Sequence, residues 1–104
     1  MPFEEFGTYV FTPEAVREDA PSASGVYAIF TPAEWVFIGA SDDVRQALFE
    51  HLNAPLPCFQ RYSPLSFSCE LAAASERADR RDALIAELRP VCDTRAESGG
   101  ITSA

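Results

Sequence analysis

The sequence contains no lysine, and all eight of its basic residues are arginine. Sixteen acidic residues oppose them, which gives a formal net charge of −8. Affinity for nucleic acid depends largely on basic side chains that neutralise phosphates, so this charge disfavours tight binding of DNA or RNA.

Cysteine is scarce, and long apolar runs are absent. The three cysteines, Cys58, Cys69 and Cys92, are odd in number and have no C-x-x-C spacing. They predict neither a disulfide framework nor a zinc site, and all three are expected to be small buried residues of a reduced cytoplasmic protein. No apolar run approaches the ~18 residues of a membrane span, and the acidic start is unlike a signal peptide. We therefore expect a cytoplasmic chain with no membrane partner.

The composition is that of a folded domain. Of the 104 residues, 47% are hydrophobic and 12% are aromatic, which is enough to bury a core. We predict a single domain over residues 1–93, in which residues 1–20 form an N-terminal segment docked on the core. Residues 94–104 lack apolar periodicity and are predicted to be a flexible tail.

Three segments have the pattern of β-strands. Residues 25–30 and 35–39 are short apolar runs rich in β-branched and aromatic side chains, joined by residues 31–34 as a hairpin. Residues 65–71 alternate apolar and polar side chains, as expected of a strand with one face on the core. This third strand is predicted to pair with the hairpin.

Helical patterns lie between and after these strands. Thr12 and Pro13 begin a short helix. Ser41 is predicted to cap a second helix that runs to Asn53, and a third helix spans residues 76–88 before Pro90. The prolines of residues 54–64 predict a long loop with buried anchors instead of a helix or central strand.

The order of elements gives the fold class. It is α/β (α+β), with a small mixed, mainly antiparallel sheet of about three strands flanked by helices. The order is β-β-α-β-α, preceded by the short N-terminal helix.

This order and two motifs resemble the GIY-YIG family, the small nuclease domain of homing endonucleases and of the excision-repair incision nuclease. Gly25-Val26-Tyr27 stands where the first signature tripeptide belongs, and Phe37-Ile38-Gly39 where the second belongs. The resemblance covers roughly residues 20 to 93. It implies phosphodiester cleavage in which a helix glutamate holds one metal ion and a helix arginine stabilises negative charge in the transition state.

Most positions that the resemblance assigns to catalysis are altered. Tyr27 matches the first tyrosine, but Phe37 replaces the second and has no hydroxyl. Ala47 takes the place of the catalytic arginine. Arg45 is two residues earlier, about 200° round the helix, and points away.

The metal-binding position is altered most. Arg81 stands where the resemblance places the metal-binding glutamate, and its positive charge would repel Mg²⁺. Asp82 is adjacent but about 100° away, and Asp93 replaces a common asparagine. Arg81 either binds an anion at this site or pairs with an acid on its own helix.

His51 shares the inner stripe of its helix with Val44 and Leu48. Two interpretations stay open: a base or ligand, or a packed residue bonded to the backbone, the second being favoured. Tyr27 is likewise either a catalytic phenol or a residue of the core.

Two functions follow from these residues. The first is a catalytically inactive domain, not an enzyme, that binds an unidentified protein or small ligand at the former active-site face and needs no cofactor. That face comprises Tyr27, Phe37, Ala47 and Arg81. The alternative is a metal-dependent DNA endonuclease, using Mg²⁺, with displaced catalytic residues. These would be Tyr27, Arg45 or Arg81, His51 and Asp82.

Overall fold

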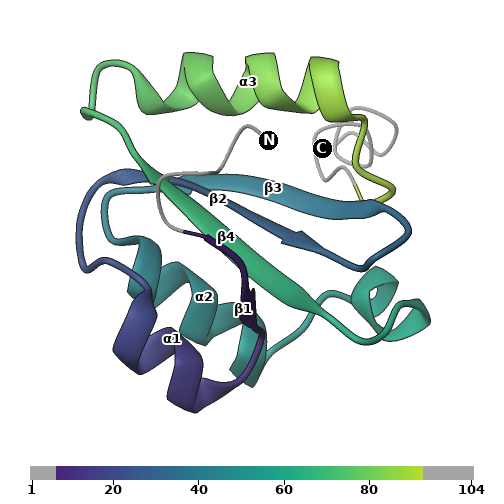
Figure 1. Ribbon diagram of the computed structural model, residues 1–104. Coiled ribbons are helices and arrows are strands. Elements are labelled where there is room, and N and C mark those ends of the chain that lie inside the picture. The colour runs from purple at the N-terminus through teal and green to yellow at the C-terminus, as the bar shows by residue number, and fades with distance from the viewer. Residues whose placement is uncertain (1–6, 93–104) are drawn as a thin grey trace.

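The structure, a computed structural model, describes residues 7–92 as three layers (Figure 1). The middle layer is an antiparallel sheet in the order β1-β4-β2-β3. Helices α1 and α2 cover one face, and α3 covers the other. The strands are β1 (Tyr9–Val10), β2 (Gly25–Phe30), β3 (Trp35–Ser41) and β4 (Ser66–Leu71), and the helices are α1 (Pro13–Asp19), α2 (Val44–Asn53) and α3 (Arg77–Leu88).

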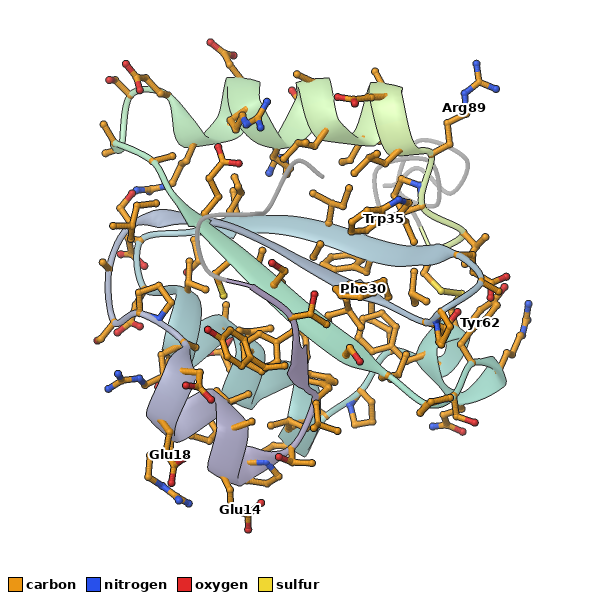
Figure 2. The ribbon with its side chains drawn as sticks, in the orientation of Figure 1. Glu14, Glu18, Phe30, Trp35, Tyr62 and Arg89 are labelled. Carbon is orange, nitrogen blue, oxygen red and sulfur yellow. A yellow bond between two sulfur atoms is a disulfide. The ribbon has the colours of Figure 1, made fainter. Side chains whose placement is uncertain are left out.

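The predicted hairpin and third strand are confirmed. β2 pairs with β3 on one side and with β4 on the other, both antiparallel. Phe30 and Trp35 close the turn end of the hairpin, where their ring centroids are 5.1 Å apart (Figure 2). β1 is a fourth strand, because Tyr9 pairs with Phe67 of β4. β3 is therefore an edge strand of the sheet.

Side-chain caps mark the starts of α1 and α2, with one correction to the prediction. Thr12 accepts a hydrogen bond from the amide of Ala15 and caps α1 as predicted. The cap of α2 is Asp43, whose carboxylate accepts from the amide of Gln46, so the prediction of Ser41 is wrong. Ser41 is still paired in β3, and a helix cannot begin until the chain has left the sheet.

Two hydrophobic clusters hold the layers together. One, between the sheet and α1 and α2, contains Val16, Ile29 and Leu48. The other, beneath α3, contains Val26 and Leu84. The side chains of β2 point alternately into one cluster and the other, because successive side chains of a strand lie on opposite faces of the sheet. Both faces of β2 are therefore covered.

The segment expected to be a loop contains a short helix. η1, a 3₁₀ helix, spans Pro57–Arg61, with Pro57 at its first position, where the missing amide hydrogen costs nothing. Phe59 within it is 2% exposed and anchors the segment to the core, so the segment has a buried anchor as predicted.

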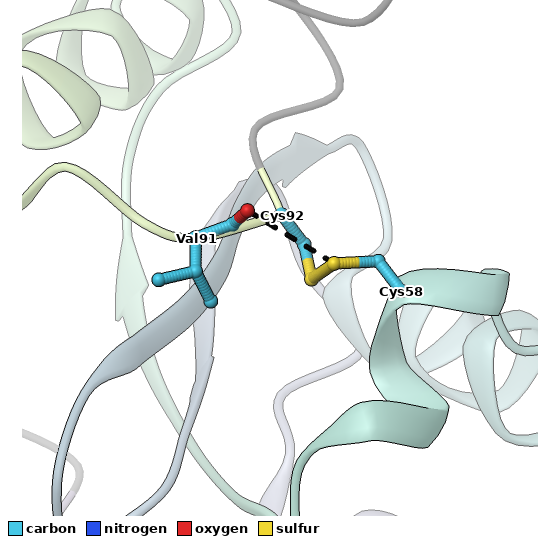
Figure 3. The surroundings of a disulfide bond; sticks show 3 residues. All are labelled: Cys58, Val91 and Cys92. Atoms are coloured by element: carbon cyan, nitrogen blue, oxygen red, sulfur yellow. Dashed lines mark hydrogen bonds between the residues drawn. A yellow bond between two sulfur atoms is a disulfide. The ribbon is translucent and has the colours of Figure 1, made fainter.

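The predicted absence of a disulfide is wrong. Cys58 and Cys92 are bonded, with Cα atoms 5.9 Å apart, across 34 residues of sequence (Figure 3). Spacing rules detect local motifs, whereas the fold makes this pair: the amide of Cys92 donates to the carbonyl of Val36, which fastens the chain after α3 to the edge of β3. Cys69 is free and buried, as expected.

Candidate functional site

The phenol of Tyr27 lies across the backbone of β3. Tyr27 is opposite Gly39 in the β2–β3 register. A Cβ atom built on Gly39 would lie 2.5 Å from the hydroxyl oxygen and from Cζ of Tyr27. The absence of a side chain at Gly39 therefore lets the ring reach the edge of the sheet.

The hydroxyl of Tyr27 is hydrogen-bonded to His51 of α2. The distance from the oxygen to Nε2 is 2.8 Å. His51 comes seven residues after Val44, so both lie on the stripe of α2 that faces the sheet. The bond to a side chain, instead of to the backbone, corrects the favoured interpretation of His51.

The two hydrogen-bonded rings pack with two further aromatic rings to make a group of four. They are Tyr27, Phe37, His51 and Phe59, which we call the aromatic cluster. Phe37 lies edge-on to His51 at 5.1 Å and to Phe59 at 5.6 Å, and the centroids of His51 and Phe59 are 5.3 Å apart. Tyr27 is 6.1 Å from Phe37. These separations are those of favourable aromatic pairs.

Burial favours the neutral form of both hydrogen-bonded groups. It raises the pKa of Tyr27 well above the ordinary value for a phenol; the Glu50 carboxylate raises it further, and the Arg81 guanidinium lowers it. Burial also lowers the pKa of His51, against a smaller opposite effect of Glu50. A neutral imidazole can accept the phenol hydrogen at Nε2, so Tyr27 has a hydrogen-bond acceptor at its hydroxyl.

Ala47 and Arg45 of α2 have different surroundings. Ala47 is half-buried and packs against the core cluster that contains Tyr27. Arg45 donates from Nε to the carbonyl oxygen of Ala20 at 2.9 Å. The guanidinium of Arg45 is thus engaged with the end of α1 and does not join the aromatic cluster.

Arg81 and Asp82 of α3 contact each other. The Nε of Arg81 donates to an Asp82 oxygen at 3.1 Å, and the Arg81 side chain is 33% exposed. α3 packs on the face of the sheet opposite α2, yet the charge of Arg81 acts on the Tyr27 hydroxyl, which lies over the edge strand. Asp93 lies outside the described residues.

Three of the matched positions, Phe37, Ala47 and Arg81, do not suit a divalent cation. Mg²⁺ requires oxygen ligands, whereas Phe37 and Ala47 offer none and Arg81 is a cation. Across residues 7–92, no group of three or more histidine, cysteine, aspartate or glutamate side chains gathers that could hold a metal ion.

Sequence reasoning missed two contributors to this site. Glu50 is exposed, as its position on α2 indicates, but its charge shifts the pKa values of both Tyr27 and His51. The loop was expected to have buried anchors, but the contact of Phe59 with His51 depends on where η1 lies in the fold. The effect of Glu50 could have been predicted, because Glu50 is the residue before His51. No local sequence signal predicts the contact between Phe59 and His51.

The fold is similar to that of solved GIY-YIG nuclease domains. The N-terminal endonuclease domain of UvrC from Thermotoga maritima, bound to its catalytic divalent cation, magnesium, has a TM-score of 0.60 and 20% identity, covering 74% of this chain and 93% of that one. A variant of that domain with phenylalanine in place of a tyrosine has a TM-score of 0.59 and 21% identity, and covers the same shares of the two chains. A variant with alanine in place of an asparagine has a TM-score of 0.60 and 20% identity, covering 74% of this chain and 92% of that one.

Further structures of that domain carry other tyrosine-to-phenylalanine substitutions. The three substituted tyrosines follow one another at intervals of ten and fourteen residues, and each variant is bound to the divalent cation. No protein-family model matches the present chain, and no curated protein matches it. The chain has a GIY-YIG-like fold, as its two tripeptides predicted.

Proposed function

We propose that this chain, with its GIY-YIG-like fold, is a non-catalytic domain that binds a ligand at the former active-site face. The charge of Arg81 carries the proposal. Its guanidinium lies within electrostatic reach of the Tyr27 hydroxyl, where the resemblance calls for a metal-binding glutamate. A fixed positive charge there opposes the binding of a divalent cation.

The spacing of the aromatic residues supports the correspondence. Tyr27, Phe37 and His51 are separated by ten and fourteen residues, as are the three tyrosines substituted in the UvrC domain. Each of those phenylalanine variants still holds its cation. The missing hydroxyl at Phe37 is therefore compatible with a metal site, and the charge of Arg81 is the stronger argument against one.

The exposure of the site favours a small polar ligand. Tyr27 and Phe37 are buried and offer little apolar surface. His51 and Arg81 are partly exposed, and Glu50 is exposed. These groups donate and accept hydrogen bonds, so a ligand with both polar functions suits the face better than an apolar protein surface does.

A nicking assay tests the absence of catalysis. Supercoiled plasmid is incubated with the protein and Mg²⁺ or Mn²⁺, alongside the Tyr27→Phe variant. We expect both proteins to leave the plasmid intact, because Arg81 and Ala47 stand where the resemblance places the metal-binding glutamate and the arginine that would stabilise the transition state. Cutting by the wild type that Tyr27→Phe abolishes would overturn the proposal.

Ligand binding is tested by nuclear magnetic resonance. The ¹⁵N-labelled protein is titrated with a panel of small carboxylates, phosphates and amides. Binding at the proposed face shifts the amide signals of Tyr27 and His51 together, and Arg81→Ala weakens it, while the exposed control Arg17→Ala on α1 does not. Shifts confined to other parts of the chain would contradict the location.

One observation favours the alternative of a displaced nuclease. The 2.8 Å hydrogen bond between Tyr27 and a neutral His51 is the arrangement of a phenol with its base. In that case Mg²⁺ would be needed and His51→Gln would abolish nicking as completely as Tyr27→Phe. Nicking retained by His51→Gln would exclude this mechanism.

A further inference from the structure

The Cys58–Cys92 disulfide offers one accessible sulfur atom to an attacking thiol. Cys58 lies in η1 and is partly exposed, whereas Cys92 is 1% exposed. Thiol–disulfide exchange requires the attacking sulfur to reach one of the two bonded sulfurs along the bond axis. Access therefore makes Cys58 the point of attack and Cys92 the leaving group.

The disulfide joins a segment that contacts the candidate site to one bonded to the strand beside it. On one side, the amides of Val91 and Cys92 donate to the carbonyls of Trp35 and Val36, at 3.0 and 2.7 Å, at the start of β3. On the other side, Cys58 precedes Phe59, whose ring contacts both Phe37 and His51. The sulfur bridge thus holds η1 against the edge of the sheet and Phe59 within the aromatic cluster.

We propose that the Cys58–Cys92 disulfide is a reversible thiol-exchange site that a dithiol reductant opens, and that opening it releases Phe59 from the aromatic cluster. A reductant thiolate attacks Sγ of Cys58, which forms a mixed disulfide and expels the Cys92 thiolate, which takes up a proton. The second sulfur of the reductant, as a thiolate, then attacks the reductant's first sulfur, which is bonded to Cys58, and Cys58 leaves and takes up a proton to become a thiol. Two electrons and two protons pass to the protein, and the reductant leaves as a disulfide.

The reduced state has a hydrogen-bond acceptor in place. Sγ of Cys58 lies 3.9 Å from the carbonyl oxygen of Val91, the contact drawn as a dashed line in Figure 3. A disulfide sulfur has no hydrogen to donate, so this bond forms only when Cys58 becomes a thiol. The carbonyl can accept from the new thiol directly after reduction, before Phe59 leaves the aromatic cluster.

Cys69 does not take part in the exchange. It lies in β4 with no exposed surface, and burial raises the pKa of its thiol to about 12. A thiol that stays protonated and covered is a poor nucleophile. Cys69 therefore provides an internal control for thiol chemistry in the folded chain.

The first test counts thiols in the full-length protein. Native protein prepared in air is alkylated with iodoacetamide, either directly or after treatment with dithiothreitol or with thioredoxin and its reductase. Mass spectrometry then gives the number of added groups. We expect no rapid alkylation before reduction and two added groups after it, with Cys58 modified about tenfold faster than Cys92 because of its exposure. Rapid alkylation of Cys58 before reduction would overturn the proposal, since no disulfide would then have been present.

The second test asks whether the aromatic cluster responds. The ring signals of His51 are followed against pH in the oxidised and reduced wild type. Reduction is expected to raise the pKa of His51 towards its ordinary value, because release of Phe59 admits water, and reoxidation reverses the change. Cys58→Ser reproduces the reduced behaviour, and Cys69→Ala still responds as the wild type does.

A purely structural disulfide would give a different result. Reduction would lower the melting temperature but leave the titration of His51 unchanged, which would overturn the proposed coupling. If Cys58→Ser does not fold, the reversible reduction of the wild type decides alone. None of these outcomes depends on the proposed ligand-binding function.

Discussion

At the scale of single residues, Gly39 and Tyr27 form one steric unit. The ring of Tyr27 occupies the space that a side chain at position 39 would need. The hydroxyl of Tyr27 reaches His51 because Gly39 has no side chain to exclude the ring. The glycine of the second tripeptide thus positions the tyrosine of the first, which explains physically why the two motifs occur together in this hairpin.

Gly39→Ala tests this steric unit. The new methyl group would lie 2.5 Å from the phenol and push the ring off β3. We expect a loss of about 1–3 kcal/mol in the free energy of unfolding, the usual cost of overpacking. Urea denaturation measures this loss, and repeating it in a Tyr27→Leu background provides the control. An equal loss in both backgrounds would show that the tyrosine is not the obstacle.

A second prediction concerns pH and His51. Burial lowers the pKa of His51, so the unfolded chain binds more protons than the folded chain below the ordinary pKa of about 6.5. The stability that neutral His51 contributes is therefore complete above about pH 6.5 and is lost as the pH falls towards the lower folded value.

Urea denaturation at several pH values checks this prediction. Between about pH 7 and pH 5.5, wild-type stability should fall more steeply than that of His51→Gln, which cannot take up a proton. Carboxylates contribute to both proteins alike, so the difference between the two curves isolates the histidine. Parallel curves would show that burial of His51 does not shift its pKa.

At the scale of elements, the strands and helices follow from local pattern. β2 and β3 are bounded by turn residues and rich in β-branched side chains, and α2 keeps a regular inner stripe from Val44 to His51. These elements could be predicted because their burial depends on residues two, three or four positions apart. The cap of α2 was predicted at the wrong residue because the local sequence does not show whether Ser41 is paired in a strand.

Contacts between distant elements could not be predicted in this way. Cys58 meets Cys92 only because the chain after α3 returns along the edge of β3, and Phe59 meets His51 only because η1 returns to the core cluster beside α2 and the sheet. Neither element shows this return in its own sequence. The candidate site was located in part by the tripeptides, but its hydrogen bond and ring contacts required the fold.

A charge reversal on α3 tests the assignment of Arg81. Arg81→Glu places a carboxylate where the resemblance calls for the metal ligand, so we expect Mn²⁺ or Mg²⁺ to stabilise this variant and not the wild type. At ten times the dissociation constant the gain would be about 1.4 kcal/mol, measured as a shift in thermal unfolding. Arg17→Glu on α1 is the matched control, with the same change of charge at an exposed position. An equal response in both variants would remove the assignment.

At the scale of the whole molecule, charge separates this chain from a typical nucleic-acid binder. The net charge is −8, and several of the described arginines are engaged within the protein. Arg80 makes two hydrogen bonds to Glu70, at 2.7 and 3.0 Å, and Arg77 donates to the hydroxyl of Ser24. Contact with a phosphate would have to break such bonds and overcome the repulsion of the acidic surface.

Fluorescence anisotropy with a labelled duplex of about 30 base pairs measures the consequence. In ~20 mM salt, where phosphate contacts are strongest, we expect no saturable change up to about 100 μM protein. A variant in which Glu14, Glu18 and Asp19 of α1 are all replaced by arginine should acquire weak binding that disappears as salt is added, because it presents new exposed cations. Binding by the wild type with the same salt dependence would mean that its arginines do reach phosphates, and the argument from net charge would fail.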